Sequence, residues 1–223
     1  MYDRETIRDN INRIFKELDG RATLLAATKT IPPEWINYAA DCGIRVIGEN
    51  RADELLEKYD RIDRDRLDIH FIGHLQTNKV RKIIDKVSMI HSLDSLPLAE
   101  EIEKQAAKRD LRMRVLIEVN LGNEAAKSGI LLEEVPSFLD AIRNMEHLIP
   151  SGLMAVPPRT DRPEDNRELF AKIYQLFIDI LRKNVDNKEW RYLSIGMSGD
   201  YLFAVENGSN LVRIGSAIFG PRG

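Results

Sequence analysis

Cysteine and long apolar runs are scarce in this sequence. The 223 residues include a single cysteine, Cys42, so no disulfide can form within the chain. No stretch of 18 apolar residues is present to span a membrane, and the first residues lack the apolar segment of a signal peptide. We therefore expect a cytoplasmic protein.

An excess of charge of one sign is also missing, because 33 lysines and arginines face 36 aspartates and glutamates, for a net charge of −3. A balanced chain has no overall attraction to phosphate backbones or anionic lipids, so we expect neither nucleic acid nor a membrane as a partner. Glycine and proline number only 13 and 9, and 43% of the residues are hydrophobic, which excludes low-complexity and disordered classes. The length suits one large domain, and we expect it to comprise residues 1–223.

Short apolar segments rich in β-branched residues alternate with segments of helical period along the whole chain. The predicted strands cover residues 23–27, 44–47, 69–72, 89–91, 113–119, 149–156, 192–195 and 211–214. The predicted helices between them cover residues 35–42, 52–59, 78–85, 96–109, 132–145, 164–183 and 200–207. This α/β alternation matches the strand count and size of a (β/α)8 or TIM barrel. An open doubly wound sheet is the alternative.

An extra amphipathic helix is predicted before the first strand. Little chain follows the eighth strand, so there is no room for a full eighth helix before Gly223. The apolar positions of the N-terminal helix offer a cover for that gap, and they are Ile7, Ile11, Ile14, Phe15 and Leu18. We expect a single barrel domain with this helix added.

A lysine follows the first predicted strand, at the end where barrels of this kind place their active sites. Lys29 comes directly after the apolar segment 23–27. A desolvated lysine there has a lowered pKa, and a neutral amine is what Schiff-base formation with an aldehyde or ketone requires. The alternative is an ordinary lysine that reaches solvent at a strand end.

Small residues end the last two strands, where barrels commonly bind phosphate through backbone N–H groups. The segments contain Ser198 and Gly199 after the seventh strand, and Gly215 and Ser216 after the eighth. Each loop alone is equally well explained by helix capping and tight turns. The two loops together with Lys29 indicate a site for a phosphorylated carbonyl compound, for which pyridoxal 5′-phosphate (PLP) is the obvious candidate.

Several segments carry a resemblance to a known family. They are residues 26–30 (AATKT), 48–51 (GENR), 70–79 (HFIGHLQTNK), 152–154 (GLM), 196–198 (GMS) and 213–220 (RIGSAIFG). In this order the chain resembles the pyridoxal phosphate homeostasis proteins of the PROSC/YggS type over nearly its whole length. The resemblance implies a TIM barrel like the alanine racemase N-terminal domain (fold type III), with PLP held as an internal aldimine on Lys29.

The same resemblance implies roles for the remaining site residues. Ser198, Gly215 and Ser216 are expected to hold the phosphate, Arg213 to face the pyridine nitrogen, and Asn50 and His74 to line the mouth of the barrel. A permanent cation beside the pyridine nitrogen disfavours its protonation and so weakens the ring as an electron sink.

These implications favour a carrier over an enzyme. The family binds, buffers and delivers PLP in vitamin B6 homeostasis, and a racemase needs a second base from an additional domain. We therefore expect PLP as the ligand, PLP-dependent apo-enzymes as recipients, a monomer, and no robust amino-acid turnover. The alternatives are a PLP-dependent racemase-like enzyme, a cofactor-free class I aldolase, whose lysine would as a rule lie on a later strand, and a barrel that acts through a protein partner.

Three residues beyond those of the proposed site also have candidate roles, and they are His70, His91 and Lys127. His70 and His74 have the spacing of a helical metal pair, but residues 69–72 read as a strand, in which four residues span about 13 Å, so we expect no metal site. His91 ends the fourth strand and is expected to be a core or rim histidine. Lys127 is a second candidate amine at the mouth.

Overall fold

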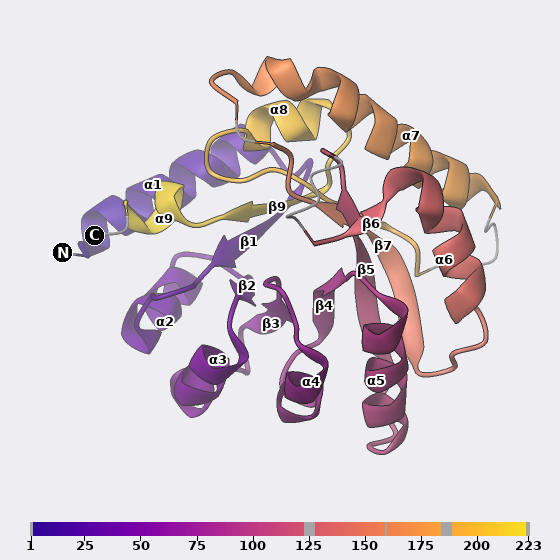
Figure 1. Cartoon of the computed structure of the whole chain (residues 1–223). Coiled ribbons are helices and arrows are strands. Elements are labelled where there is room, and N and C mark those ends of the chain that lie inside the picture. The colour runs from indigo at the N-terminus through magenta and orange to yellow at the C-terminus, as the bar shows by residue number, and fades with distance from the viewer. Residues whose placement is uncertain (1, 123–127, 159, 184–188, 222–223) are drawn as a thin grey trace.

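The protein is a closed barrel of parallel strands surrounded by helices (Figure 1). A computed structural model describes residues 2–122, 128–158, 160–183 and 189–221. The strands are β1 (Thr23–Ala27), β2 (Val46–Glu49), β3 (Asp68–Phe71), β4 (Met89–Leu93), β5 (Met113–Asn120), β6 (Ile130–Leu131), β7 (Leu148–Ala155), β8 (Tyr192–Ser194) and β9 (Leu211–Ile214). All described strand pairs are parallel, so the carboxyl ends of the strands meet at one mouth.

Two pairings decide between a barrel and an open sheet. Strand β1 pairs with both β2 and β9, and β4 pairs with β5 through Met89 opposite Arg114 and Ile90 opposite Val115. The order β1-β2-β3-β4-β5-β7-β8-β9 therefore returns to β1. The predicted (β/α)8 barrel is confirmed, and the open sheet is wrong.

The helices occupy the predicted segments between the strands. They are α1 (Arg4–Leu18), α2 (Pro33–Asp41), α3 (Ala52–Lys58), α4 (Thr77–Ile83), α5 (Leu96–Ala107), α6 (Val135–Ile142), α7 (Arg167–Lys183), α8 (Tyr201–Glu206) and α9 (Ser216–Phe219), with 3-10 turns at Tyr59–Arg61, Leu132–Glu134 and Pro163–Asn166. Among the described residues, no helix is long and apolar enough to cross a bilayer.

The sequence did not predict β6 or α9, because each is shorter than the period that would reveal it. Strand β6 is two residues long and pairs with the end of β5, where Val119 lies opposite Ile130. Helix α9 is a single turn directly after Gly215. Both elements lie at the mouth of the barrel.

Helix α1 covers the end of the chain, as its pattern predicts. The carboxylate of Asp3 caps it by accepting a hydrogen bond from the Thr6 N–H at 2.8 Å, and α1 packs against α2, α8 and α9. The side chain of Asn10 donates to the Ile218 carbonyl at 3.1 Å. Four of the five expected apolar positions are buried, but Phe15 is 38% exposed because it lies at the edge of the stripe, beside Gly43.

The barrel interior is more polar than the layer outside it. Side chains alternate along each strand, so Ile90, Leu153 and Val212 join the apolar layer between the strands and the helices. Their neighbours face inward, where Met89, Leu116 and Met154 form a small apolar cluster. The other inward positions include polar and charged side chains, which are His70, His91, Glu118, Ser194 and Arg213.

Replacement of Ile11 by alanine tests the role of α1 in covering the barrel. Ile11 is fully buried, so Ile11→Ala removes packed methyl groups and should lower the free energy of unfolding by about 2–5 kcal/mol in urea denaturation. Asn12→Ala, at the neighbouring exposed position, should change it by less than about 0.5 kcal/mol. Equal effects of the two substitutions would contradict the packing of α1.

Candidate functional site

The carboxyl ends of adjacent strands bring the predicted site residues to one mouth. Lys29 follows β1, which has β2 on one side, with Ala27 opposite Gly48, and β9 on the other, with Ala26 opposite Ile214. Asn50 therefore lies directly after the neighbouring strand β2, and Gly215 and Ser216 lie directly after the other neighbour, β9. Because β8 pairs with β9, the loop that carries Ser198 lies at the same edge.

Lys29 sits in a tight turn at this mouth. The Ile31 N–H donates to the Thr28 carbonyl at 2.9 Å, which closes a four-residue turn with Lys29 in its second position. The Lys29 side chain is half-buried, and its amine forms no hydrogen bond or ion pair with any residue that the structure describes. The amine is thus available for reaction.

The loops after β8 and β9 converge on one oxygen atom. The Ser198 hydroxyl accepts hydrogen bonds from the backbone N–H groups of Gly215 and Ala217, both at 3.2 Å. A side chain at Gly199 would meet open space. The Ser198 hydroxyl, the two backbone N–H groups that meet at it and the open space at Gly199 are the kinds of group that hold the oxygens of a phosphate.

Arg213 is buried inside the barrel and rigidly held. One terminal nitrogen of its guanidinium donates to the Ser194 carbonyl and to the Ser194 hydroxyl, each at 2.7 Å, and the other donates to the Ala155 carbonyl at 2.9 Å. Burial lowers the pKa of Arg213 to about 10, against the opposing charges of Glu118 and Asp200. Arg213 therefore remains a cation at neutral pH.

A chain of hydrogen bonds links Arg213 to the opposite end of the barrel. The nitrogen Nδ1 of His91 lies 3.4 Å from the Ser194 hydroxyl, His91 Nε2 lies 2.9 Å from His70 Nδ1, and His70 Nε2 lies 3.2 Å from the Asp68 carboxylate. Burial is the main cause that lowers the pKa of His91 well below its usual range, and the charge of Arg213 adds to it, so this imidazole is neutral.

The direction of each bond in the chain follows from its two ends. The guanidinium can only donate and an ionised carboxylate can only accept, so the Ser194 hydroxyl donates to His91, His91 Nε2 donates to His70, and His70 Nε2 donates to Asp68. His91 is thus an interior residue that supports Arg213 through Ser194.

Asn50 and His74 lie at the rim of the mouth. The backbone of Asn50 approaches Gly73 so closely that a Cβ atom at position 73 would lie 2.1 Å from the Asn50 carbonyl oxygen. The His74 side chain is 59% exposed, and its Nδ1 lies 3.3 Å from the carboxylate of Asp94. His70 bonds instead to His91 and Asp68, so the two histidines have different partners. Lys127 lies outside the described residues.

Glu118 is a charged residue of the site that the sequence interpretation missed. It faces inward from β5 and shares the interior with Arg213. Burial and the nearby Asp94 carboxylate raise its pKa to about 7, while Arg213 and His74 oppose the rise. The sequence feature that could have revealed Glu118 is its place as the single acidic residue within the apolar segment 113–119.

The raised pKa of Glu118 predicts a pH-dependent stability. Between pH 4.5, its ordinary pKa, and about 7, the folded protein keeps a proton that the unfolded chain releases, so the free energy of unfolding falls as the pH rises. Glu118→Gln removes this dependence. It should match the wild type below pH 4.5 and exceed it above pH 7 by about 3 kcal/mol in urea denaturation, since one pKa unit corresponds to about 1.4 kcal/mol.

Glu100→Gln provides the control for this prediction, because Glu100 is exposed on α5. The control should follow the wild type at every pH. A constant difference between Glu118→Gln and the wild type from acid to neutral pH would contradict the assigned titration.

Comparison with known proteins gives a consistent result. The family model described as the alanine racemase N-terminal domain matches residues 2–223. A protein of Aquifex aeolicus named "Pyridoxal phosphate homeostasis protein" is 43% identical over 201 residues, which cover 90% of this chain and 87% of the relative.

Solved structures agree with the fold. PipY of Synechococcus elongatus, whose structure contains bound PLP, has a TM-score of 0.87 at 26% identity over 96% of this chain and all of its own. An alanine racemase of Clostridium difficile has a TM-score of 0.82 at 16% identity, with 98% of this chain and 60% of that chain covered, and shows the shared barrel alone. By its sequence and its barrel, the chain belongs to the pyridoxal phosphate homeostasis protein family, which is built on the alanine racemase N-terminal fold.

Proposed function

We propose that this protein binds PLP at the mouth of its barrel and acts in PLP homeostasis, with the cofactor attached covalently to Lys29. The observation that carries the proposal is the free amine of Lys29 at the same mouth as the converging N–H groups of Gly215 and Ala217. The bound PLP in PipY and the names of the relatives support it.

The site residues have distinct tasks in this proposal. The group that binds supplies an aldehyde for the covalent bond and a phosphate for anchoring. Lys29 provides the amine, and Ser198, Gly215 and Ser216 hold the phosphate. Arg213 faces the pyridine nitrogen, and Asn50 and His74 line the entrance.

Arg213 is the reason to propose a carrier without robust amino-acid turnover. Three hydrogen bonds fix its guanidinium, which stays charged at neutral pH. A fixed cation at the pyridine nitrogen disfavours protonation there, so the ring withdraws electrons less strongly. A racemase-like enzyme of the same fold is the alternative.

The wider setting of the proposal rests on the sequence. We place the protein in the cytoplasm as a monomer that buffers PLP and passes it to PLP-dependent apo-enzymes. A half-buried amine at an open mouth supports exchange with a recipient, because the bond to Lys29 can re-form with another amine.

Attachment to Lys29 is tested by absorbance spectroscopy, borohydride reduction and peptide mapping. Wild-type protein with PLP should be yellow and give a reduced pyridoxyl adduct at Lys29, because reduction traps the carbon–nitrogen bond. Lys29→Ala should lose nearly all of the adduct, whereas Lys16→Ala, at an exposed position of α1, should retain it. A colourless wild-type protein without any adduct would contradict the proposal and favour the cofactor-free aldolase.

Incubation of the PLP-loaded protein with L-alanine, followed by chiral analysis, distinguishes the carrier from the racemase. The carrier should leave the enantiomer ratio at the level of free PLP. Steady accumulation of D-alanine, abolished in Lys29→Ala, would establish the racemase instead.

A further inference from the structure

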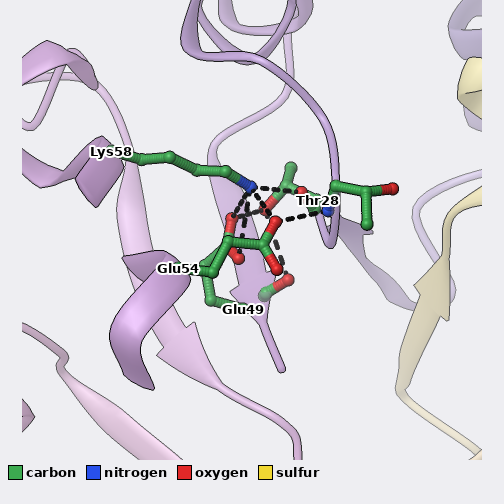
Figure 2. A network of polar contacts seen from close by, with 6 residues as sticks. Thr28, Glu49, Glu54 and Lys58 are labelled. Atoms are coloured by element: carbon green, nitrogen blue, oxygen red, sulfur yellow. Dashed lines mark hydrogen bonds and ion pairs between the residues drawn. The ribbon is translucent and has the colours of Figure 1, made fainter. Parts of the chain in front are cut away.

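A buried polar cluster lies directly behind Lys29. It consists of Thr28 at the end of β1, Glu49 at the end of β2, and Glu54 and Lys58 on α3 (Figure 2). Thr28 and Glu49 are fully buried and Lys58 is 8% exposed. Because side chains alternate along a strand, Thr28 and Glu49 lie on the helix side of the sheet, as do Ala26 and Ile47.

Lys58 is the centre of the cluster. Its amine donates to the Thr28 carbonyl at 2.9 Å, to Glu49 Oε1 at 3.2 Å and to Glu54 Oε1 at 2.5 Å, which uses all three of its protons. The Thr28 hydroxyl donates to Glu49 Oε1 at 2.6 Å. Burial raises the pKa of Glu49, and the charge of Lys58 and the Thr28 hydroxyl oppose the rise.

The cluster holds the backbone on both sides of Lys29. On one side, the Thr28 carbonyl accepts from Lys58 as well as from the Ile31 N–H. On the other side, the Thr30 N–H donates to the Glu54 carboxylate. Lys29 is therefore fixed through both neighbouring residues, although no member of the cluster bonds to its side chain.

The turn at Lys29 needs such support because its conformation is strained. Thr30 has a φ of 65°, a left-handed conformation that turns normally reserve for glycine and that β-branched residues rarely adopt. A strained residue of this kind persists only where surrounding contacts determine it. The Glu54 carboxylate supplies the contact at the strained residue itself.

We propose that Glu49, Glu54 and Lys58 are positioning residues, which hold the turn so that the Lys29 amine meets the PLP aldehyde; this inference rests on the proposed function. In that step the neutral amine nitrogen adds to the aldehyde carbon and a carbon–nitrogen double bond forms. The two amine protons leave with the carbonyl oxygen as one water molecule. The rate depends on how well the amine is oriented toward the carbon.

Two substitutions at Glu54 test the proposal. Glu54→Ala removes the acceptor of the Thr30 N–H and should slow covalent bond formation with PLP roughly tenfold, as followed by visible absorbance. Glu54→Gln retains a carbonyl oxygen for that N–H and should stay within about threefold of the wild type. Glu57→Ala, at an exposed position of the same helix, is the matched control and should change nothing.

A second ligand distinguishes positioning from general damage to the site. Pyridoxine 5′-phosphate carries an alcohol in place of the aldehyde, so it uses the same phosphate and ring contacts but cannot bond to Lys29. Its affinity should be the same in Glu54→Ala and the wild type, because the cluster does not touch those contacts. Equal rates in Glu54→Ala and the wild type, or a parallel loss of affinity for the alcohol, would overturn the positioning role.

A replacement variant and the wild-type adduct keep the result of this test unambiguous. If Glu54→Ala does not fold, the double variant Thr30→Gly and Glu54→Ala replaces it, because glycine adopts the left-handed turn without strain. The freed turn should still react roughly tenfold more slowly, and a wild-type rate would overturn the proposal. Absence of any Lys29 adduct in the wild type would instead refute the proposed function, and the positioning role with it.

Discussion

The closure of a parallel sheet is the constraint on which the rest of the structure depends. Pairing of β4 with β5 and of β9 with β1 joins the strands into a ring, and parallel pairing brings their carboxyl ends to one mouth. The ring makes Lys29 and the loop after β9 neighbours, although nearly the whole chain separates them. The pairing of β1 with β9 thereby gives the amine and the converging N–H groups a common site.

Closure also creates an interior that can hold a buried cation. An isolated guanidinium would pay a large desolvation penalty there, but Arg213 donates three hydrogen bonds to atoms at the ends of β7 and β8. The hydrogen-bonded chain from Ser194 through His91 and His70 to Asp68 then orders the interior from the mouth to the opposite end. The hydrogen bonds that stabilise Arg213 in the interior therefore also fix the position of its positive charge.

A second polar layer lies outside the ring and acts on the amine. Glu49 and Lys58 are buried between the sheet and α3, and their bonds reach the backbone beside Lys29. The polar groups inside the barrel and the cluster outside it therefore have different roles. In the function that we propose, Arg213 faces the pyridine ring of PLP, whereas the cluster holds the turn at Lys29.

Much of this arrangement can be predicted from the sequence, because the spacing of hydrophobic residues along the chain identifies the strands and helices. Strand β1 matches its predicted range, and the amphipathic pattern of α7 is long enough to define the helix. The position of Lys29 at a strand end follows from the same pattern, since a barrel with eight strands has one functional mouth.

The remaining features depend on tertiary contacts that no local pattern contains. Glu54 and Lys58 have the spacing of a solvent-exposed helical pair, and only the packing of α3 against β2 shows that Lys58 is buried and that Glu54 is partly buried beside it. Glu118 is a single acid in an apolar strand, and its raised pKa comes from burial and, to a smaller extent, from Asp94, which follows β4. Strand β6 has only two residues, too few for any periodicity.

A crystal structure of the protein soaked with PLP tests the central claim most directly. The account predicts continuous electron density from the Lys29 amine to the ligand, the phosphate against the Ser198, Gly215 and Ser216 loops, and Arg213 at the ring nitrogen. Ligand density away from the mouth, or a ring nitrogen that faces the Glu118 carboxylate instead of Arg213, would contradict it.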